Sequence, residues 1–259
     1  MPLRRDRGMY TVFEQDIDER IHVIVIDIPQ IDPDLKTFLD SNIVSICEGS
    51  SGGDVDIVKQ ELRVLFNEKD FNWKMGAIAE FFMHLHIRTM GFKQEFLYRN
   101  LEEGSIKKGF DGLFSKDAVI WLMESKSGSI NATNISHVSK IKEAMKDLKD
   151  KVAGIGQTNN PWKNAYNHAS QIDVCAASSL RADLKKLSDD FISGCYHDIN
   201  EFNTIPCGTI FLDGVWQMFS SSNIVQGITQ ITSRLYGKKV IAICMTQNTI
   251  DLFMNYLNS

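Results

Sequence analysis

The spacing of apolar residues along the chain predicts alternating strands and helices. Residues 21–28 (IHVIVIDI) are an almost unbroken run of β-branched residues ended by Pro29, which is typical of a buried strand. Between Met75 and Met90 the apolar residues recur at helical spacing, and Gly91 supplies a stop. The same rules predict strands at 92–99, 109–114, 119–125, 208–212 and 240–245, and helices at 33–41, 137–152, 162–170, 179–192 and from 249 onward. This order favours an α/β or mixed α+β fold, with a central mixed sheet flanked by helices.

The division of the chain into domains is open at this stage. Its 259 residues are enough for one large domain or two small ones. The sequence GSSGG at 49–53 is either a loop or a linker. We therefore expect an N-terminal addition over residues 1–70, which binds a partner, and a main domain with C-terminal elements over residues 71–259. A single domain over the whole chain is the alternative.

Composition narrows the class of protein. With 43% hydrophobic and 24% charged residues, the chain is typical of a globular protein, which excludes a disordered, collagenous or coiled-coil protein. Its 28 Lys and Arg against 33 Asp and Glu give a net charge of −5, which argues against a broad basic face for nucleic acid but not against local contact. Five scattered cysteines, no apolar leader and only short apolar runs predict a cytoplasmic protein with reduced thiols that does not enter a membrane.

Three charged residues near the middle of the chain suggest chemistry. Glu124 and Lys126 end an apolar strand and point to the same side of it, and burying such charges without partners is costly. If 109–114 and 119–123 pair as a hairpin, Asp111 lies within a step or two of Glu124. Two carboxylates are ligands that Mg²⁺ prefers, and a nearby ammonium offsets charge in a phosphoryl-transfer transition state. The group predicts a metal-dependent phosphodiester hydrolase.

These residues resemble the signature of the PD-(D/E)XK nuclease superfamily. Asp111, twelve further residues and then Glu124-Ser125-Lys126 match its pattern, and Glu80 on the preceding helix matches a frequent fourth member. The helix–strand–strand–strand order also matches, although Phe110 stands where many members have proline. The resemblance implies a restriction-endonuclease-like core that cleaves DNA with Mg²⁺, or with Mn²⁺ as a substitute. It also implies metal binding by Asp111, Glu124, Glu80 and the Ser125 carbonyl, with Lys126 positioning or helping to activate the attacking water.

A narrower resemblance is to the nuclease-subunit family of the Hachiman antiphage defence systems. It is carried by GAIAEFF…KKGFDGLF…VIWLMESKSG, roughly residues 75–130. This resemblance implies a superfamily 2 helicase partner that senses aberrant DNA and restrains the nuclease. Release would then permit DNA degradation as an antiviral defence.

Simpler interpretations stay open for each residue. Glu124 and Lys126 are alternatively a solvent-facing ion pair, Asp111 part of a turn, and Glu80 the polar boundary of its helix. His84, one turn from Glu80, is more typical of a structural histidine. Candidate contacts to nucleic acid, each with a solvated surface as its alternative, are Lys107, Lys108, Ser127 and Lys140. The rival functions are a non-catalytic interaction subunit that keeps the nuclease fold, and a sequence-specific dimeric restriction endonuclease.

Overall fold

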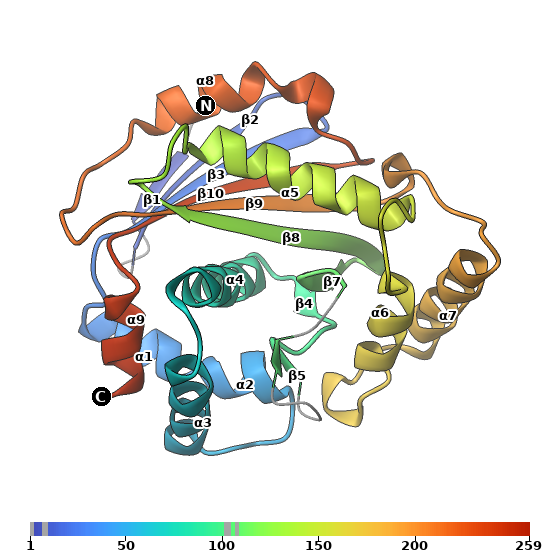
Figure 1. Cartoon of the computed structure of the whole chain (residues 1–259), viewed down its shortest axis with the longest axis horizontal. Helices are drawn as coiled ribbons and strands as arrows, with labels where there is room; N and C mark the ends of the chain where they lie inside the picture. Colours follow the sequence, from blue (N-terminus) through green and yellow to red (C-terminus); the bar gives the residue numbers. More distant parts are fainter. Residues whose placement is uncertain (1–2, 7–9, 101–104, 107–108) are drawn as a thin grey trace.

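One mixed sheet organises the chain (Figure 1). The computed structural model describes residues 3–6, 10–100, 105–106 and 109–259. The strand order is β1-β2-β3-β10-β9-β8-β7-β4. The four central strands run parallel: β3 (Ile21–Ile28), β10 (Val240–Gln247), β9 (Asn203–Phe211) and β8 (Val119–Ser129). The edges are antiparallel, with β1 (Leu3–Asp6) and β2 (Thr11–Asp16) on one side and β7 (Gly112–Lys116) and β4 (Lys93–Gln94) on the other. The expected mixed α/β class is confirmed.

Helices cover both faces of this sheet (Figure 1). One face carries α5 (His137–Val152) and α8 (Ser221–Thr229). The other carries α4 (Phe71–Thr89), beyond which lie α1 (Pro33–Asp40), α2 (Ile43–Glu48), α3 (Val55–Asn67) and α9 (Asp251–Leu257). The remaining elements are α6 (Pro161–Ala169), α7 (Ser178–Ile192), the strand pair β5 (Arg99–Asn100) and β6 (Ser105–Ile106), and 3₁₀ turns at Ile172–Val174, Ile199–Glu201 and Thr232–Arg234. No helix among the described residues has both the length and the apolar character needed to cross a membrane.

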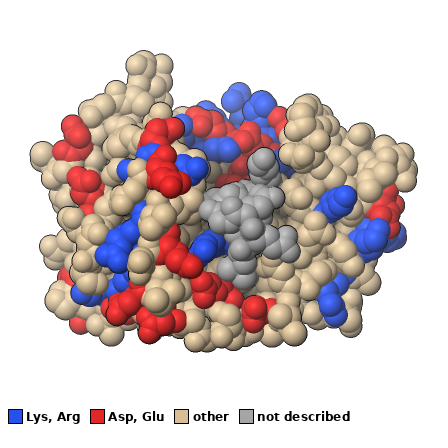
Figure 2. All heavy atoms as spheres, turned by 60° about the horizontal axis from the view of Figure 1, so that its bottom comes forward, with Lys and Arg blue, Asp and Glu red and all other residues tan. Residues whose placement is uncertain are grey.

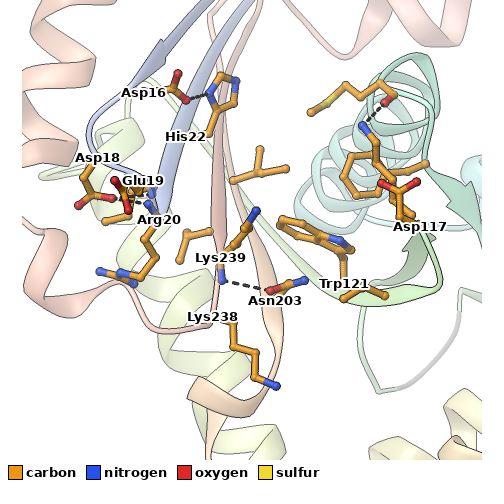
Figure 3. Close-up of a pocket in the computed structure, with 17 residues that line it drawn as sticks. Asp16, Asp18, Glu19, Arg20, His22, Asp117, Trp121, Asn203, Lys238 and Lys239 are labelled. Atoms are coloured by element: carbon orange, nitrogen blue, oxygen red, sulfur yellow. Dashed lines mark hydrogen bonds and ion pairs between the residues drawn. The ribbon is translucent and has the colours of Figure 1, made fainter.

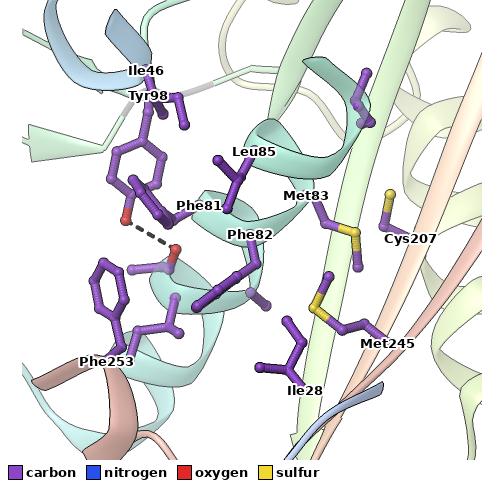
Figure 4. Close-up of a cluster of buried hydrophobic side chains, with 14 of the residues drawn as sticks. Ile28, Ile46, Phe81, Phe82, Met83, Leu85, Tyr98, Cys207, Met245 and Phe253 are labelled. Carbon is purple, nitrogen blue, oxygen red and sulfur yellow. Dashed lines mark hydrogen bonds between the residues drawn. The ribbon is translucent and has the colours of Figure 1, made fainter. Parts of the chain in front are cut away.

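Helix α4 is enclosed by the core, which explains its unusually apolar sequence. Most of its side chains from Met75 to Ile87 are buried. On the sheet side, Met83 lies toward Met245 and Cys207 (Figure 4). On the opposite side, the Tyr98 hydroxyl donates a 2.9 Å hydrogen bond to a main-chain carbonyl of α4. A helix packed on both sides has no broad solvent face, so a charged residue in it requires an internal partner.

Several predicted elements have the expected bounds. Strand β3 covers residues 21–28 and helix α5 covers residues 137–152, as the sequence predicted. Helix α1 begins after Asp32, whose side chain accepts a 2.8 Å hydrogen bond from the Leu35 amide and so caps the helix. The segment at 49–53 is a loop between α2 and α3. The helices and strands without a counterpart in the sequence prediction are β1, β2, α2, α3, β6 and α8.

Other bounds were wrong for identifiable reasons. Only two residues of the predicted strand 92–99 join the sheet, because the chain then turns to α2, where the Tyr98 amide donates to the Ile46 carbonyl. The strand predicted at 109–114 begins at Gly112 instead, since Gly109 has a φ of +120°. Strand β8 continues to Ser129 because it stays paired with β9 throughout. The strand is therefore longer than the predicted 119–125 and includes residues 127–129.

Candidate active site

A tight hairpin places Asp111 next to Glu124. Strands β7 and β8 pair with Gly112 opposite Met123, and the turn residues Asp117 and Ala118 both have positive φ, as a two-residue type I′ turn requires. Asp111 immediately precedes Gly112, the first residue of β7. Its Oδ2 accepts a 2.8 Å hydrogen bond from the Ser125 amide. The predicted hairpin is present, and its open end brings the two carboxylate-bearing residues to the same place.

Glu124 is enclosed by two ammonium groups. Its carboxylate is almost fully buried, with Oε1 3.0 Å from Lys126 Nζ and Oε2 2.5 Å from Lys151 Nζ. Lys126 Nζ also lies 2.6 Å from Asp147 Oδ2. The pair is therefore not the solvent-facing ion pair of the simpler interpretation. Neither Asp147 nor Lys151 was assigned a role from the sequence, although their i,i+4 spacing places them on one side of α5.

The close approach of α5 to the sheet follows from glycines in the strands. A Cβ on Gly208 of β9 would lie 3.0 Å from the His137 carbonyl oxygen and 3.0 Å from Lys140 Cβ. A Cβ on Gly128 of β8 would lie 2.6 Å from the end of the Ile135 side chain. Because these positions lack side chains, the helix backbone lies against the strands. Its last turns, which carry Asp147 and Lys151, reach the charged residues of β8.

Glu80 reaches the site from the other side of the sheet. It lies on α4, and α4 and α5 are on opposite sides of β8 (Figure 1). His84 Nε2 is 3.5 Å from Glu80 Oε1 and 3.1 Å from the main-chain oxygen of Asp111. Asp111 is thus linked to α4 through His84 and to β8 through the Ser125 amide. This arrangement gives His84 the structural role that was the simpler interpretation.

The site carries more buried negative charge than its cations offset. Burial, and then the charge of Asp111, raise the pKa of Glu124 to about 7, against the opposing effects of Lys151 and Lys126. Burial, and then the charge of Glu80, raise the pKa of Asp111. Burial lowers the pKa of Lys126, but Glu124 and the hydrogen bond with Asp147 outweigh it, so the net change is upward. Both carboxylates would gain from a further cation.

The oxygen donors that could hold such a cation are few. Among the residues that the structure describes, no group of three or more His, Cys, Asp or Glu side chains is arranged to hold a metal ion. Asp111 and Glu124 supply carboxylates, and Ser125 adds a main-chain oxygen. The N–H and C=O of one strand residue point to the same edge, so the carbonyl of Ser125 faces the Asp111 side rather than β9. Glu80 approaches from α4, and its charge helps to raise the pKa of Asp111, so it is a further candidate carboxylate at this site.

The candidate contacts to nucleic acid are less well supported. Lys107 and Lys108 lie outside the described residues. Lys140 Nζ lies 2.8 Å from Glu143 Oε2, so its charge has an intrahelical partner. Ser127 is paired in register with Thr209 of β9 and is part of the ladder.

Comparison with known proteins does not identify a family. No protein-family model matches the chain, and no curated protein matches it.

A separate cavity of about 590 Å³ lies at the opposite ends of the parallel strands (Figure 3). Its walls include residues at the starts of β3, β8, β9 and β10, with Trp121, Asn203, Lys238 and Lys239 among them. None of the described candidate site residues lines it. The cavity and the acidic site are thus distinct parts of the molecule, and the cavity contributes nothing to the chemistry argued below.

Proposed function

We propose that the chain is a Mg²⁺-dependent nuclease that hydrolyses phosphodiester bonds of DNA. The observation that supports this most is the meeting of Asp111, Glu124 and Lys126 at the open end of the β7–β8 hairpin. These residues come from two neighbouring chain segments. They supply the two carboxylates and the one ammonium that metal-dependent phosphodiester hydrolysis requires. A structural ion pair would not require a second, partly buried carboxylate beside the first.

The order of elements around the site supports the same proposal. Helix α4 is followed by β4, by the short strand pair β5 and β6, and by β7 and β8; α5 comes next, and β9 follows after α6 and α7. Strands β4, β7, β8 and β9 are neighbours in that order, antiparallel except for the parallel pair β8 and β9. This agrees with the helix–strand–strand–strand core of the superfamily whose motif the sequence resembles.

The donor set fits a magnesium ion. Asp111, Glu124 and the Ser125 carbonyl would hold it, since all are hard oxygen ligands; Glu124 is buried, Asp111 is partly buried, and the pKa of each carboxyl is raised. Bound there, Mg²⁺ would polarise a phosphoryl oxygen and lower the pKa of a water. Three protein oxygens leave room for water and phosphate, as Mg²⁺ sites usually do.

Lys126 acts as a charged hydrogen-bond donor in this proposal. Its pKa is raised, so Nζ stays protonated and cannot accept a proton from water. Asp147 and Glu124 hold the ammonium between them. From that position it orients a water or a phosphate oxygen and offsets charge that develops during hydrolysis.

The proposal includes a partner that supplies the hold on DNA. Figure 2 shows acidic and basic side chains interspersed on the face turned forward from the bottom of Figure 1. With a net charge of −5, the chain has little general attraction for a polyanion. A superfamily 2 helicase, as the Hachiman resemblance implies, would provide it and restrain the nuclease. Co-purification with a helicase encoded beside this chain, and cleavage with and without it, test this part.

Cleavage of plasmid, linear duplex and single-stranded DNA tests the activity itself. We expect cleavage with Mg²⁺ that is lost in Lys126→Ala and Glu124→Gln. Lys146→Ala is a matched control, because Lys146 lies on α5 and its ion pair is with Asp150, not with Asp111, Glu124 or Lys126. Undiminished cleavage by a folded Lys126→Ala variant would refute the proposal. Defined fragments in place of a smear would favour a sequence-specific restriction enzyme.

A further inference from the structure

Lys151 occupies the oxygen of Glu124 that the two-residue motif leaves free. Lys126 binds Oε1 at 3.0 Å, and Lys151 binds Oε2 at 2.5 Å. The Glu124 side chain is only 1% exposed, so little of the carboxylate is open to solvent. Both oxygens of the motif glutamate are therefore covered by ammonium groups of this chain.

Helix α5 supplies this cation in a fixed position. Its buried apolar side packs on the sheet, with Ile141, Met145, Leu148 and Val152 inward. Its first residue, His137, is bonded to the Met245 carbonyl of β10. These contacts fix the rotation of α5 about its axis and its position along the sheet. As a result, Asp147 faces Lys126 and Lys151 faces Glu124. The four side chains form one chain of contacts, Asp147–Lys126–Glu124–Lys151.

A metal ion bound through Glu124 Oε2 would compete with Lys151 for that oxygen. An ion bound by Glu124 through Oε2 requires an oxygen to which Lys151 now donates. Lys126 contacts the other oxygen of Glu124, Oε1, and shares its ammonium with Asp147. Until a metal binds, Lys151 provides the charge compensation without which the buried carboxylate would be strongly unfavourable.

We infer that Lys151 is a built-in, displaceable counter-ion of the metal site, which holds Glu124 in place without metal and must leave it when a divalent ion binds. The inference rests on the proposed function, since it takes Glu124 as a metal ligand. It makes Lys151 a positioning residue that sets the affinity for metal. It also means that metal binding frees an ammonium at the end of α5, where it becomes available to a phosphate.

Titration with MnCl₂ by calorimetry tests the inference on the intact chain. In Lys151→Met, which keeps the aliphatic stem, we expect Mn²⁺ to bind about tenfold more tightly, because no cation has to be displaced; this corresponds to ~1.4 kcal/mol. Lys146→Met removes the same charge from the same helix, where the partner is Asp150, and should bind Mn²⁺ like the wild type. Lys151→Arg keeps the charge and should also stay near the wild-type affinity.

A second measurement does not depend on the folding of a variant. Amine-reactive labelling of the wild type, followed by mass spectrometry, reports the accessibility of Lys151 with and without Mn²⁺. We expect its labelling to rise several-fold with Mn²⁺, while that of Lys146 stays constant. Unchanged labelling, or equal or weaker Mn²⁺ binding by Lys151→Met, would overturn the inference. Those outcomes leave the nuclease proposal standing if Lys126→Ala is inactive; persistent cleavage by Lys126→Ala refutes the nuclease proposal instead.

Discussion

Two histidines of this chain are expected to give opposite pH dependence to its stability. His137, the first residue of α5, is buried, and its Nε2–H donates a 3.1 Å hydrogen bond to the Met245 carbonyl. Burial lowers its pKa from 6.5 to about 4, although the bond to Met245 opposes the change. The helix N-terminus also disfavours a positive charge at this position. The folded protein therefore holds His137 neutral at pH values where the unfolded chain protonates it.

The sign and size of the effect follow from proton linkage. Between pH 6.5 and about 4 the unfolded state binds more protons, so the free energy of unfolding falls as the pH is lowered. The difference between the two pKa values corresponds to about 3.4 kcal/mol when protonation is complete. From pH 7.5 to pH 5 the loss due to His137 is about 2 kcal/mol.

His197 is the matched control with the reverse sign. Its Nδ1 lies 3.0 Å from Glu201 Oε2 and its Nε2 3.3 Å from Asp190 Oδ2. The hydrogen bond with Glu201 raises its pKa, partial burial opposes this, and Asp190 adds to the increase. Its contribution is present below the unfolded pKa and is lost as the pH rises through the folded pKa. His197→Gln should therefore cost stability at acid pH and little at alkaline pH.

Urea unfolding of the wild type, His137→Gln and His197→Gln at pH 7.5 and pH 5 provides the assay. His137→Gln removes a hydrogen bond and costs stability at neutral pH, but its fall between the two pH values should be smaller than that of the wild type by about 2 kcal/mol. The comparison uses the change in the free energy of unfolding between the two pH values. In that comparison, the contributions of titrating groups common to all three proteins cancel. If His137→Gln and the wild type lose the same stability, the neutral, buried state assigned to His137 is wrong.

Two further predictions concern helix placement and metal binding. Gly208→Ala should lower the free energy of unfolding by about 1–3 kcal/mol, because its Cβ would meet the backbone of α5 at 3.0 Å; Gly76→Ala in α4 meets no atom within 4 Å and should add about 0.5–1 kcal/mol. Equal effects in urea unfolding would contradict the close packing of α5. Because the pKa of Glu124 is about 7, Mn²⁺ should bind roughly tenfold more weakly at pH 6 than at pH 8. Calorimetry at constant ionic strength measures this, and a pH-independent affinity would mean that Glu124 is not a ligand.

The local geometry of the site was predictable because it depends on neighbours in sequence. Alternation along β8 places Glu124 and Lys126 on one side, and hairpin pairing brings Asp111 beside them. Both are short-range rules that a single sequence contains. The α5 helix was likewise predictable in full, since its apolar side repeats at helical spacing.

The partners of these residues were not predictable, because they depend on how distant elements pack. Lys151 is 27 residues from Glu124, and its contact requires α5 to lie close against the strands at Gly128 and Gly208. In the sequence it is one of several lysines interleaved with acidic residues, a pattern typical of a solvated helix face. The short strand at 93–94 was also obscured, because residues 96–98 are apolar for contacts outside the main sheet.

The exposure of the four charged groups is graded, and this decides what a substrate meets first. The exposed fraction of the side chain is 1% for Glu124, 15% for Lys151, 29% for Lys126 and 39% for Asp147. A phosphate that approaches the site therefore meets Lys126 before Glu124, but it meets Asp147 as well. The outer carboxylate partly cancels the attraction of the outer ammonium, so this part of the site holds an anion weakly on its own. A metal ion bound by Glu124, behind Lys126, would add positive charge and so increase the attraction for phosphate. In the proposed nuclease, the metal would therefore be needed to hold the substrate as well as to cleave it.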